Sequence, residues 1–572
     1  MLVKIKINGF EYQEDSSLTI LAVAKKHGIR IPTLCYLKKE EANFEHKPAS
    51  CRVCVVEVKG RRTLVPACAT NITEGMEVFT NTPRVRRERK TIVELLLSNH
   101  PNDCLACEKS GHCGLQDLAI ELGIKRISFD APLSHPNEVI TSGAIIRNPS
   151  KCILCNRCTA VCEKIQSIGA ISASQRGFAT LISEPHDCVN CGQCVQVCPT
   201  GALLQVDDTY RVEEELNDPD KFVVIQTAPS VRVALGEPFS LPPGTDVTGK
   251  MITALRMMGF KKVFDTNFGA DLTIMEETAE LLQRVNENKN LPLITSCCPG
   301  WIKFIETQYP ELIHLPSSCK SPQEMFSAVC KTYYAEKEGI DPSKIVVVSL
   351  MPCIAKKSEA AREEMMVRGL QPTDYSLSVK EFANMLKRYG IDLATCDDGT
   401  FDAPLGESTG AADIFGNTGG VMEAAVRTAC MLTTNEFPHD IEFYGMQGYT
   451  NTKHAYVDLA GKQLHLCVVS GLANARRILE EIKEGKATYD AIEVMACPGG
   501  CVNGGGQPLH KVTPHVQVVK ARREGLQKID NNKSVRISCE NPAIKQLYEE
   551  YLEKPSSHVA HELLHRTYKI DE

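Results

Sequence analysis

Residues 152–162 have the sequence CILCNRCTAVC, and residues 188–199 have the sequence CVNCGQCVQVCP. Both segments space four cysteines as C-x2-C-x2-C-x3-C, so the second is an internal repeat of the first. A proline follows the last cysteine of the second run, whereas Glu163 follows the last cysteine of the first. Eight thiols at these intervals predict iron–sulfur clusters and argue against structural zinc, whose ligands are spaced differently.

This spacing is typical of bacterial ferredoxins, in which the fourth cysteine of each run ligates the other cluster. One [4Fe–4S] cluster is therefore predicted on Cys152, Cys155, Cys158 and Cys198. The other is predicted on Cys188, Cys191, Cys194 and Cys162. We expect residues 140–210 to form a ferredoxin-like domain around both clusters.

The chain as a whole is long, acidic and rich in cysteine. Its 572 residues correspond to about three to five domains, and 43% hydrophobic with 24% charged residues exclude a fibre or a disordered chain. A net charge of −7 disfavours nucleic-acid binding, and no apolar stretch reaches the ~20 residues that span a membrane. The start, MLVKIKINGF, is typical of a strand and not of a secretory signal, which favours a cytoplasmic protein. In a reducing cytoplasm, 26 cysteines indicate metal ligands more than disulfides.

Residues 1–78 are predicted to form a small β-rich domain with a metal site. VKIKING and EVFTNT are expected to be strands, and LTILAVAKKHG is expected to be an amphipathic helix. The ligands would be Cys35, Cys51, Cys54 and Cys68. As in plant-type [2Fe–2S] sites, one loop supplies most ligands and a distant cysteine completes the set, although the upstream gap is longer here. A structural zinc site is the alternative.

Residues 79–118 combine a helix with a mixed ligand set. RVRRERKTIVELLLSN is expected to be helical, with its basic run as a solvated face more than a docking patch for an acidic carrier. The ligand set that follows is His100, Cys104, Cys107 and Cys113. Imidazole suits both zinc and iron, but the neighbouring ferredoxin repeat favours an iron–sulfur cluster at this site and at the preceding one. A chain of such clusters would conduct electrons.

From about residue 218, strand-like and helix-like runs alternate. KFVVIQTA and KIVVVSLM are expected to be buried strands, which predicts an α/β domain of roughly 290 residues. Three cysteine motifs lie in it: TSCCPGW at 295–301, MPCIAKK at 351–357 and MACPGGCVNGGGQ at 495–507. Proline and glycine border each motif, so the cysteines should lie on turns near element ends, where reactive groups are usually presented. Four of these thiols could hold a further cubane.

These three motifs resemble the signature segments of [FeFe]-hydrogenases, and the cluster chain before them resembles that of the large, multi-cluster members. The resemblance covers almost the whole chain, although residues 1–200 alone are equally similar to the electron-input subunit of complex I. It implies a multidomain α+β and α/β protein with a two-lobed α/β catalytic domain, a β-grasp [2Fe–2S] domain and a helical tail like the family's small subunit. The expected domains are 1–78, 79–118, 140–210, 218–510 and 511–572.

The resemblance also implies a cofactor and roles for particular residues. The H-cluster, a [4Fe–4S] cubane linked to a di-iron subsite with CO, cyanide and azadithiolate, would be held by Cys298, Cys353, Cys497 and Cys501, with Cys501 as the bridge. Cys297 would be the proton-relaying thiol, and the relay toward solvent would continue through Glu280, Ser317 and Glu277, with Arg284 near its outer end. Lys356 would bind one cyanide, Pro229 and Ser230 the other, and the pocket would be lined by Gln323, Met351, Phe415 and Met495.

Several of these residues also have ordinary structural interpretations. Glu277 and Glu280 are three apart on an expected helix and share one face, which without the resemblance would be a solvated acidic stripe. Cys319 in SSCKSPQ departs from the smaller residue common in the family, and a packed thiol is favoured over a redox-sensitive one. HELLHRTY places His561 and His565 four apart, for which helix packing is favoured over a metal site.

The implied function is reversible 2H⁺ + 2e⁻ ⇌ H₂ in the cytoplasm. Expected partners are ferredoxin and/or NAD(P)-linked flavin and Fe–S subunits, together with hydrogenase maturases; no nucleic-acid or membrane partner is expected. The alternatives are an Fe–S assembly protein of the same fold, a sensory hydrogenase and a pure electron-transfer subunit. The complete cysteine set, including Cys297, argues against the assembly protein and the sensor, and the residues beyond 200 argue against the electron-transfer subunit.

Overall fold

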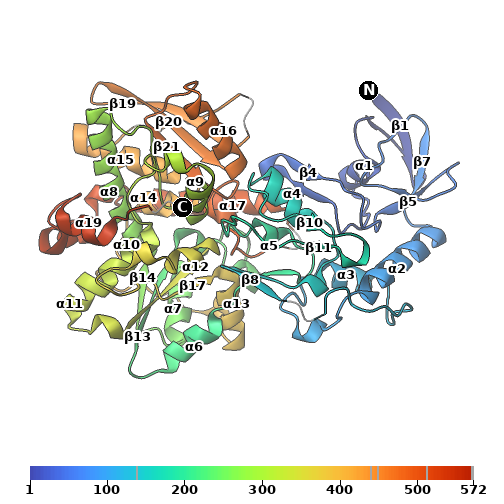
Figure 1. The fold of residues 1–572 in the computed structure, drawn as a ribbon, viewed down its shortest axis with the longest axis horizontal. Coiled ribbons are helices and arrows are strands. Elements are labelled where there is room, and N and C mark those ends of the chain that lie inside the picture. Colours follow the sequence, from blue (N-terminus) through green and yellow to red (C-terminus); the bar gives the residue numbers. More distant parts are fainter. Residues whose placement is uncertain (137–138, 439–440, 448–449, 511–512, 569–572) are drawn as a thin grey trace. The chain divides into compact units, whose positions relative to one another are not determined.

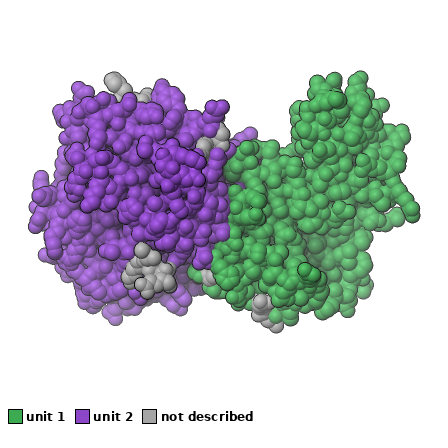
Figure 2. Space-filling view, turned by 45° about the horizontal axis from the view of Figure 1, so that its top comes forward, with its two compact units in different colours: residues 1–164, 169–186, 194–204 green, residues 165–168, 187–193, 205–572 purple. Residues whose placement is uncertain are grey.

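The computed structural model describes residues 1–572 except 137–138, 439–440, 448–449, 511–512 and 569–572. Two compact units are distinguished in Figure 2. Unit 1 comprises residues 1–164, 169–186 and 194–204, and unit 2 comprises residues 165–168, 187–193 and 205–572. The expected start of the C-terminal segment, at residue 511, lies outside the described residues.

Unit 1 begins with a five-stranded sheet in the order β2-β1-β7-β5-β6 (Figure 1). Its strands are β1 Leu2–Ile7, β2 Phe10–Asp15, β5 Val55–Val58, β6 Val65–Pro66 and β7 Met76–Phe79. Side chains of β1 alternate between exposed and buried, as expected for a strand with one face on a core. The Thr19 side chain caps α1, Ile20–Lys26, by accepting a hydrogen bond from the Ala22 amide. The strands and the helix predicted for residues 1–78 are thereby confirmed.

The predicted basic helix is α2, Pro83–Ser98. Arg84, Arg86, Arg87 and Lys90 are exposed, which confirms a solvated basic face. Arg89 differs, because it is buried and donates to the Val55 carbonyl at 2.8 Å. The remaining elements up to residue 205 are β3 Leu37–Lys39, β4 Phe44–His46, α3 Gly114–Glu121, β8 Ile140–Ser142, β9 Ile145–Arg147, α4 Arg157–Lys164, β10 Ala173–Ser174, β11 Leu181–Ile182, α5 Gln193–Val197 and β12 Leu203–Gln205.

Unit 2 contains two sheets that lie apart in Figure 1 and form two α/β lobes. The first is parallel, in the order β14-β13-β16-β17, with bounds Lys262–Asp265, Phe222–Thr227, Ile345–Met351 and Tyr375–Ser378. The second has the order β15-β21-β20-β19-β18, with bounds Leu293–Ile294, Ala491–Met495, Lys462–Ser470, Thr452–Leu459 and Tyr444–Gly445. β15, β20 and β21 are parallel, so the carboxyl ends of these strands share one edge. The two predicted strands are β13 and β16, and every residue of β16 is buried.

Helices pack against both sheets. Those used below are α8 Thr266–Glu287, α9 Pro299–Gln308, α10 Pro322–Val329, α12 Ala355–Ala360, α14 Gly410–Asp413 and α15 Gly420–Thr434. Other helices of this unit include α6 Thr209–Asn217, α7 Thr248–Met257, α11 Ala335–Glu338, α13 Val379–Arg388 and α16 Leu472–Lys483. Among the described residues, no helix combines the length and the apolar character needed to cross a bilayer.

The C-terminal segment is helical, with α17 His515–Asn532, α18 Pro542–Leu547 and α19 His558–Leu564. Leu563 and Leu564 of α19 are fully buried in one apolar cluster with Phe326 of α10. The helix-packing interpretation of HELLHRTY therefore holds for these leucines.

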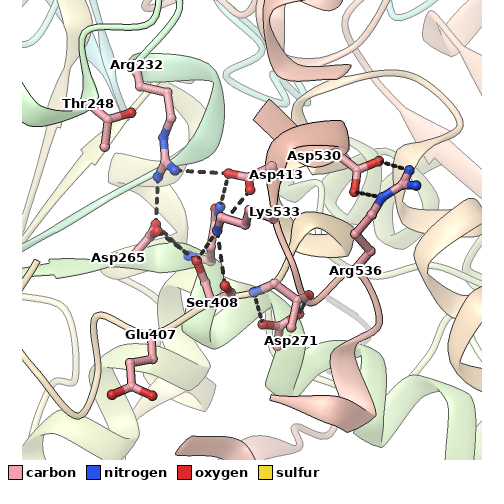
Figure 3. A network of polar contacts seen from close by, with 12 residues as sticks. Arg232, Thr248, Asp265, Asp271, Glu407, Ser408, Asp413, Asp530, Lys533 and Arg536 are labelled. Carbon is pink, nitrogen blue, oxygen red and sulfur yellow. Dashed lines mark hydrogen bonds and ion pairs between the residues drawn. The ribbon is translucent and has the colours of Figure 1, made fainter. Parts of the chain in front are cut away.

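A buried ion-pair network joins this segment to the loops around the first sheet (Figure 3). The Arg232 guanidinium donates to Asp265 Oδ1 at 2.7 Å and to Asp413 Oδ1 at 3.0 Å. Lys533 Nζ, directly after α17, lies 2.9 Å from Asp413 Oδ2. Because the three arginine and aspartate side chains are at most 2% exposed, each charge depends on its partners for stabilisation.

Candidate active site

The three cysteine motifs begin where strands end. β15 leads to Cys297 and Cys298, β16 leads to Cys353, and β21 leads to Cys497 and Cys501. Since ligands bind outside the carboxyl ends of parallel strands, both sheets direct their motifs toward a possible ligand site. The segment after β13 carries Pro229 and Ser230 to the same place.

Two glycines of the third motif lie too close to neighbouring loops to allow a side chain. A Cβ atom at Gly504 would lie 2.3 Å from the Pro352 carbonyl oxygen, and one at Gly500 would lie 2.7 Å from the Gly416 carbonyl oxygen. Gly500 also has a φ of +103°, which L-residues rarely adopt. The glycine-rich end of the third motif therefore allows the MPC loop and the MACPGGC loop to pack backbone against backbone.

A cavity of about 90 Å³ lies among these loops. Every cysteine and pocket residue expected from the sequence lines it: Cys297, Cys298, Cys353, Cys497, Cys501, Pro229, Ser230, Gln323, Met351, Lys356, Phe415 and Met495. The lining is mostly apolar, with few polar groups to fix an occupant, as is usual for cofactor sites.

Burial keeps the thiols of the cavity neutral when no metal is bound. It raises the pKa of Cys353 to about 11, and it raises the pKa of Cys497 well above its ordinary value, with further contributions from neighbouring cysteines. The pKa values of Cys298 and Cys501 are raised for the same first reason. A thiol must lose its proton to bind a metal, so these cysteines would become thiolates only when the iron of a bound cluster stabilises the negative charge.

The donors around the cavity fit an iron–sulfur group. The Ala496 amide donates to Cys298 Sγ at 3.4 Å, and the Gln193 side-chain amide donates to Cys497 Sγ at 3.3 Å. Hydrogen bonds to cluster sulfurs are a principal means of setting reduction potentials. Ser230 Oγ is buried and has no hydrogen-bond partner among the described residues, so it is available to an occupant of the cavity.

Lys356 supplies the positive charge that the resemblance implies, and it is paired with a carboxylate, Glu359, that was not predicted from the sequence. Its Nζ donates to Glu359 Oε2 at 2.6 Å and to the Cys297 carbonyl at 3.2 Å. Burial alone would lower the pKa of Lys356, but the Glu359 carboxylate outweighs burial and raises it. The lysine therefore stays charged at the cavity wall. Glu359 follows Lys356 by three residues on α12, and this helical spacing was the signal that could have revealed the pair.

Glu277 lies on α8 beside the TSCC motif and is 2% exposed. Its Oε1 accepts hydrogen bonds from the Ser296 amide and hydroxyl, both at 3.2 Å. Burial raises the pKa of Glu277 to about 7. The alternative of a solvated acidic stripe is therefore wrong for this residue.

Glu280 lies one helical turn farther along α8 and is half-buried. Its Oε2 accepts from Ser317 Oγ at 2.8 Å, and its Oε1 accepts from the Arg284 guanidinium at 2.5 Å. Glu277 is the carboxylate whose charge acts on the Cys297 thiol, while Glu280 lines an outer cavity. The family resemblance was taken to imply that Glu280 precedes Glu277 along the relay. The structure corrects this order, because α8 carries Glu277 on the side of Cys297 and Glu280 on the side of solvent.

Unit 1 gathers further ligand candidates. The [2Fe–2S] set Cys35, Cys51, Cys54 and Cys68 is at most 8% exposed, and the Cys35 amide donates to Cys51 Sγ at 3.4 Å. Cys152, Cys155, Cys158 and Cys198 all line one cavity of about 300 Å³. The other ferredoxin set is divided between the units, with Cys162 and Cys194 in unit 1 and Cys188 and Cys191 in unit 2, so its cluster stays a prediction.

His100, a predicted cluster ligand, is buried and has one unpaired ring nitrogen among the described residues. Its side chain is 9% exposed, its Nδ1 accepts from the Asn102 amide at 3.3 Å, and its Nε2 has no partner within the described part of the chain. Cys104, Cys107 and Cys113 of the same predicted set are half-buried. A metal-ligating histidine usually donates a hydrogen bond from its other ring nitrogen, whereas His100 Nδ1 accepts one here, so ligation by His100 stays a prediction.

Comparison with known proteins decides the family. Residues 221–505 match the model of the iron only hydrogenase large subunit, C-terminal domain, and residues 516–570 match that of the iron hydrogenase small subunit. The chain is 49% identical to the NADP-reducing hydrogenase subunit HndD of Solidesulfovibrio fructosivorans, over 99% of both chains. The chain belongs to the [FeFe]-hydrogenase family. It is also 39% identical to iron hydrogenase 1 of Clostridium pasteurianum, again over 99% of both chains.

The solved structures agree with this membership. A structure of the [FeFe]-hydrogenase HydA1 from Chlamydomonas reinhardtii is matched with a TM-score of 0.58 and 40% identity, over 64% of this chain and 99% of that chain. Protein NAR1 of Arabidopsis thaliana is 30% identical, but over only 61% of this chain. The full-length matches are therefore to hydrogenases, and the family resemblance, the fold class and the enzyme class predicted from the sequence are confirmed.

Three ranges of the N-terminal region match iron–sulfur domain models. Residues 1–83 match a 2Fe-2S iron-sulfur cluster binding domain, and residues 151–202 match a 4Fe-4S dicluster domain. Residues 89–128 match the NADH-ubiquinone oxidoreductase-G iron-sulfur binding region. This [FeFe]-hydrogenase is therefore an iron–sulfur protein along most of its length, and a purely zinc-binding protein is excluded.

Proposed function

We propose that this chain catalyses 2H⁺ + 2e⁻ ⇌ H₂ at an H-cluster in the cavity of about 90 Å³. The observation that carries the proposal is the convergence of five cysteines from three strand ends on that cavity, in a chain matched end to end by hydrogenases. When bound, the di-iron subsite with CO, cyanide and azadithiolate supplies the redox chemistry on hydrogen.

The residues of this chain would hold and orient that group. Cys298, Cys353, Cys497 and Cys501 would ligate the cubane, with Cys501 as the bridge to the di-iron subsite. Lys356, Pro229 and Ser230 would bind the cyanides, and Gln323, Met351, Phe415 and Met495 would exclude water from the remaining wall. The attraction between a positive charge and an anionic ligand is stronger in a dry pocket, because the local dielectric is low.

Protons would move along side chains of α8 and its neighbouring loops. Cys297 would exchange a proton with the bound group and with Glu277, whose pKa of about 7 suits it to accept and release protons near neutrality. Ser317 would pass the proton to Glu280, and Arg284 would fix the Glu280 carboxylate at the outer end.

Electrons would travel through one [2Fe–2S] cluster and three [4Fe–4S] clusters in the N-terminal region. The proposed ligands are Cys35, Cys51, Cys54 and Cys68; His100, Cys104, Cys107 and Cys113; and the eight cysteines of the ferredoxin repeat. A histidine ligand would raise the potential of its cluster, by analogy with Rieske centres. The domains would follow the expected limits 1–78, 79–118, 140–210, 218–510 and 511–572.

The electron partners would be ferredoxin and/or NAD(P)-linked flavin and Fe–S subunits in the cytoplasm. Two observations support a multisubunit complex: the name of the HndD relative, an NADP-reducing hydrogenase subunit, and the match of residues 89–128 to a region of a respiratory complex subunit. Hydrogenase maturases would install the di-iron subsite.

Anaerobic protein produced with hydrogenase maturases tests the catalytic proposal. Infrared bands of bound CO and cyanide, iron content and H₂/D₂O isotope exchange are the readouts. We expect all three in the natural chain, and loss of the infrared bands in Cys353→Ala but not in Cys396→Ala, a cysteine outside the cavity. Zinc in place of iron, or no exchange in protein with the bands present, would contradict the proposal.

A further inference from the structure

One histidine of the C-terminal segment contacts the outer carboxylate of the proposed relay through a serine. His565 Nδ1 lies 2.8 Å from Ser318 Oγ, and Ser318 Oγ lies 3.3 Å from Glu280 Oε2. His565 follows α19 directly and is 8% exposed. These groups form a hydrogen-bonded chain that ends on Glu280 Oε2, whereas Arg284 contacts Glu280 Oε1.

The second ring nitrogen of His565 is held by a buried acid. His565 Nε2 lies 3.1 Å from Glu276 Oε2, and Glu276 is fully buried. The Tyr548 hydroxyl donates to Glu276 Oε1 at 2.6 Å, and the Ser556 amide donates to Oε2 at 2.8 Å. With these donors the carboxylate is an acceptor, so Nε2 carries a proton and Nδ1 is left to exchange a proton with Ser318.

Solvent reaches this histidine through a separate cavity. The cavity, of about 290 Å³, is lined by Glu280, Arg284, Ser318, Ser556, His561 and His565. His561 is exposed, and its ring centroid lies 4.1 Å from that of His565. An exposed imidazole therefore lies, tilted by 37°, against the buried one at the outer end of the hydrogen-bonded chain.

We propose that Ser318 and His565 form a second proton branch, which connects Glu280 to solvent through the C-terminal segment. This inference rests on the proposed relay and extends it. In the outward direction the Glu280 carboxyl proton passes to Ser318 Oγ as the Ser318 hydroxyl proton passes to His565 Nδ1. The imidazolium, stabilised by the Glu276 carboxylate, then releases its proton to solvent in the cavity, and His561 collects protons for the reverse direction.

Acidic and neutral side chains surround His565. The groups that face it are Glu276 and Glu280 from α8, Cys319, His561 and, through Glu276, Tyr548. Burial raises the pKa of the Cys319 thiol well above its ordinary value, so this neighbour is neutral.

Variants of the branch separate proton transfer from structure. We expect His565→Gln and Ser318→Ala to lower H₂ evolution with an artificial reductant by about tenfold or more. This loss is smaller than the roughly 10²–10⁴ expected for a lost acid–base group, because protons can still leave Glu280 on the side of Arg284. The solvent isotope effect should increase as proton transfer becomes limiting, with CO and cyanide bands unchanged. His454→Gln, a histidine on β19 outside the relay, is the matched control.

Chemical rescue distinguishes a proton-carrying role of His565 from a purely structural one. In His565→Ala, added imidazole should enter the cavity and restore turnover, whereas tetramethylammonium at equal ionic strength should not. Donor atoms of Glu280, Cys319 and His565 lie within 4.8 Å of one another and could bind a divalent metal ion, so all assays contain a chelator.

The outcomes are distinguishable from one another. Natural turnover and isotope effect in His565→Gln would overturn the branch. Lost turnover that imidazole does not restore, with intact infrared bands, would show a positioning role and would also overturn it. Absence of infrared bands or of isotope exchange in the natural chain would instead contradict the proposed function itself.

Discussion

At the scale of single residues, burial determines which chemistry a side chain can perform. Glu277 and Glu280 are one turn apart on α8, yet Glu277 is buried next to Ser296 while Glu280 is paired with Arg284. Burial therefore raises the pKa of the inner carboxyl group, that of Glu277, to about 7. A carboxyl group with that pKa exchanges protons at neutral pH without a large free-energy difference between its two forms.

The variant Glu277→Gln keeps the shape of the side chain and removes its titration. We expect H₂ evolution and uptake to fall by about 10²–10⁴-fold, the usual contribution of a positioned acid–base group. Infrared bands and iron content should match those of the natural chain. Glu338→Gln, an exposed position at the end of α11, serves as the control. Turnover within about twofold of the natural value would exclude Glu277 from the relay.

The raised pKa of Glu277 also predicts opposite pH profiles for the two directions. Uptake needs the carboxylate to accept a proton, and evolution needs the carboxylic acid to donate one. At constant driving force, uptake should therefore rise and evolution should fall as pH increases through about 7. Protein-film voltammetry between pH 5 and 9 measures both. Two flat profiles between pH 6 and 8 would show that a different group limits proton transfer.

Gly504 tests how closely the loops must pack. In Gly504→Ala the new Cβ atom would lie 2.3 Å from the Pro352 carbonyl oxygen, which is backbone and cannot rotate away. The MPC and MACPGGC loops must then separate, and we expect little or no incorporation of the active-site cubane. Iron content and infrared bands measure this loss. Gly485→Ala has open space around its Cβ, and although its φ of +67° adds some strain, it should retain the bands.

At the scale of elements, the C-terminal helices stabilise the walls of the active site. Arg522 of α17 makes two 2.7 Å hydrogen bonds to Glu237 and donates to the Val502 carbonyl at 2.8 Å, directly after Cys501. The network of Figure 3 similarly connects Lys533 to Asp413, which lies two residues before Phe415 of the pocket. The segment matched by the small-subunit model thus contacts residues next to proposed ligands.

The variant Asp413→Asn should destabilise this arrangement, because it leaves Arg232 and Lys533 without a shared counter-charge. Breaking a buried ion pair on one side typically costs about 3–5 kcal/mol. We expect a lower midpoint of thermal unfolding and slower incorporation of the cofactor. Asp397→Asn, an exposed aspartate, is the control. An unchanged midpoint would mean that the network contributes no net stability.

At the scale of the whole molecule, local sequence patterns predicted the cluster motifs and an α/β domain, because ligand spacing and strand periodicity are local features. The division of that domain into two lobes was implied only by the family resemblance. They did not predict contacts made across the chain. The His565–Glu276 pair joins residues 289 positions apart, and no periodicity signals it. The order of Glu277 and Glu280 was likewise set by which neighbours α8 meets, Ser296 on one side and Ser317 with Arg284 on the other.

The two units also predict that electron and proton chemistry can be separated by mutation. Cys158→Ser removes a proposed cluster ligand that lines the cavity of about 300 Å³ in unit 1, whereas the proposed catalytic cavity and relay belong to unit 2. H₂/D₂O exchange needs no net electron flow, so we expect it to persist at near-natural rates. H₂-dependent reduction of an external acceptor should fall by more than tenfold, because a broken cluster chain interrupts conduction. Cys396→Ser should change neither rate. Equal loss of both activities in Cys158→Ser would mean that this cluster is needed for the catalytic unit to fold.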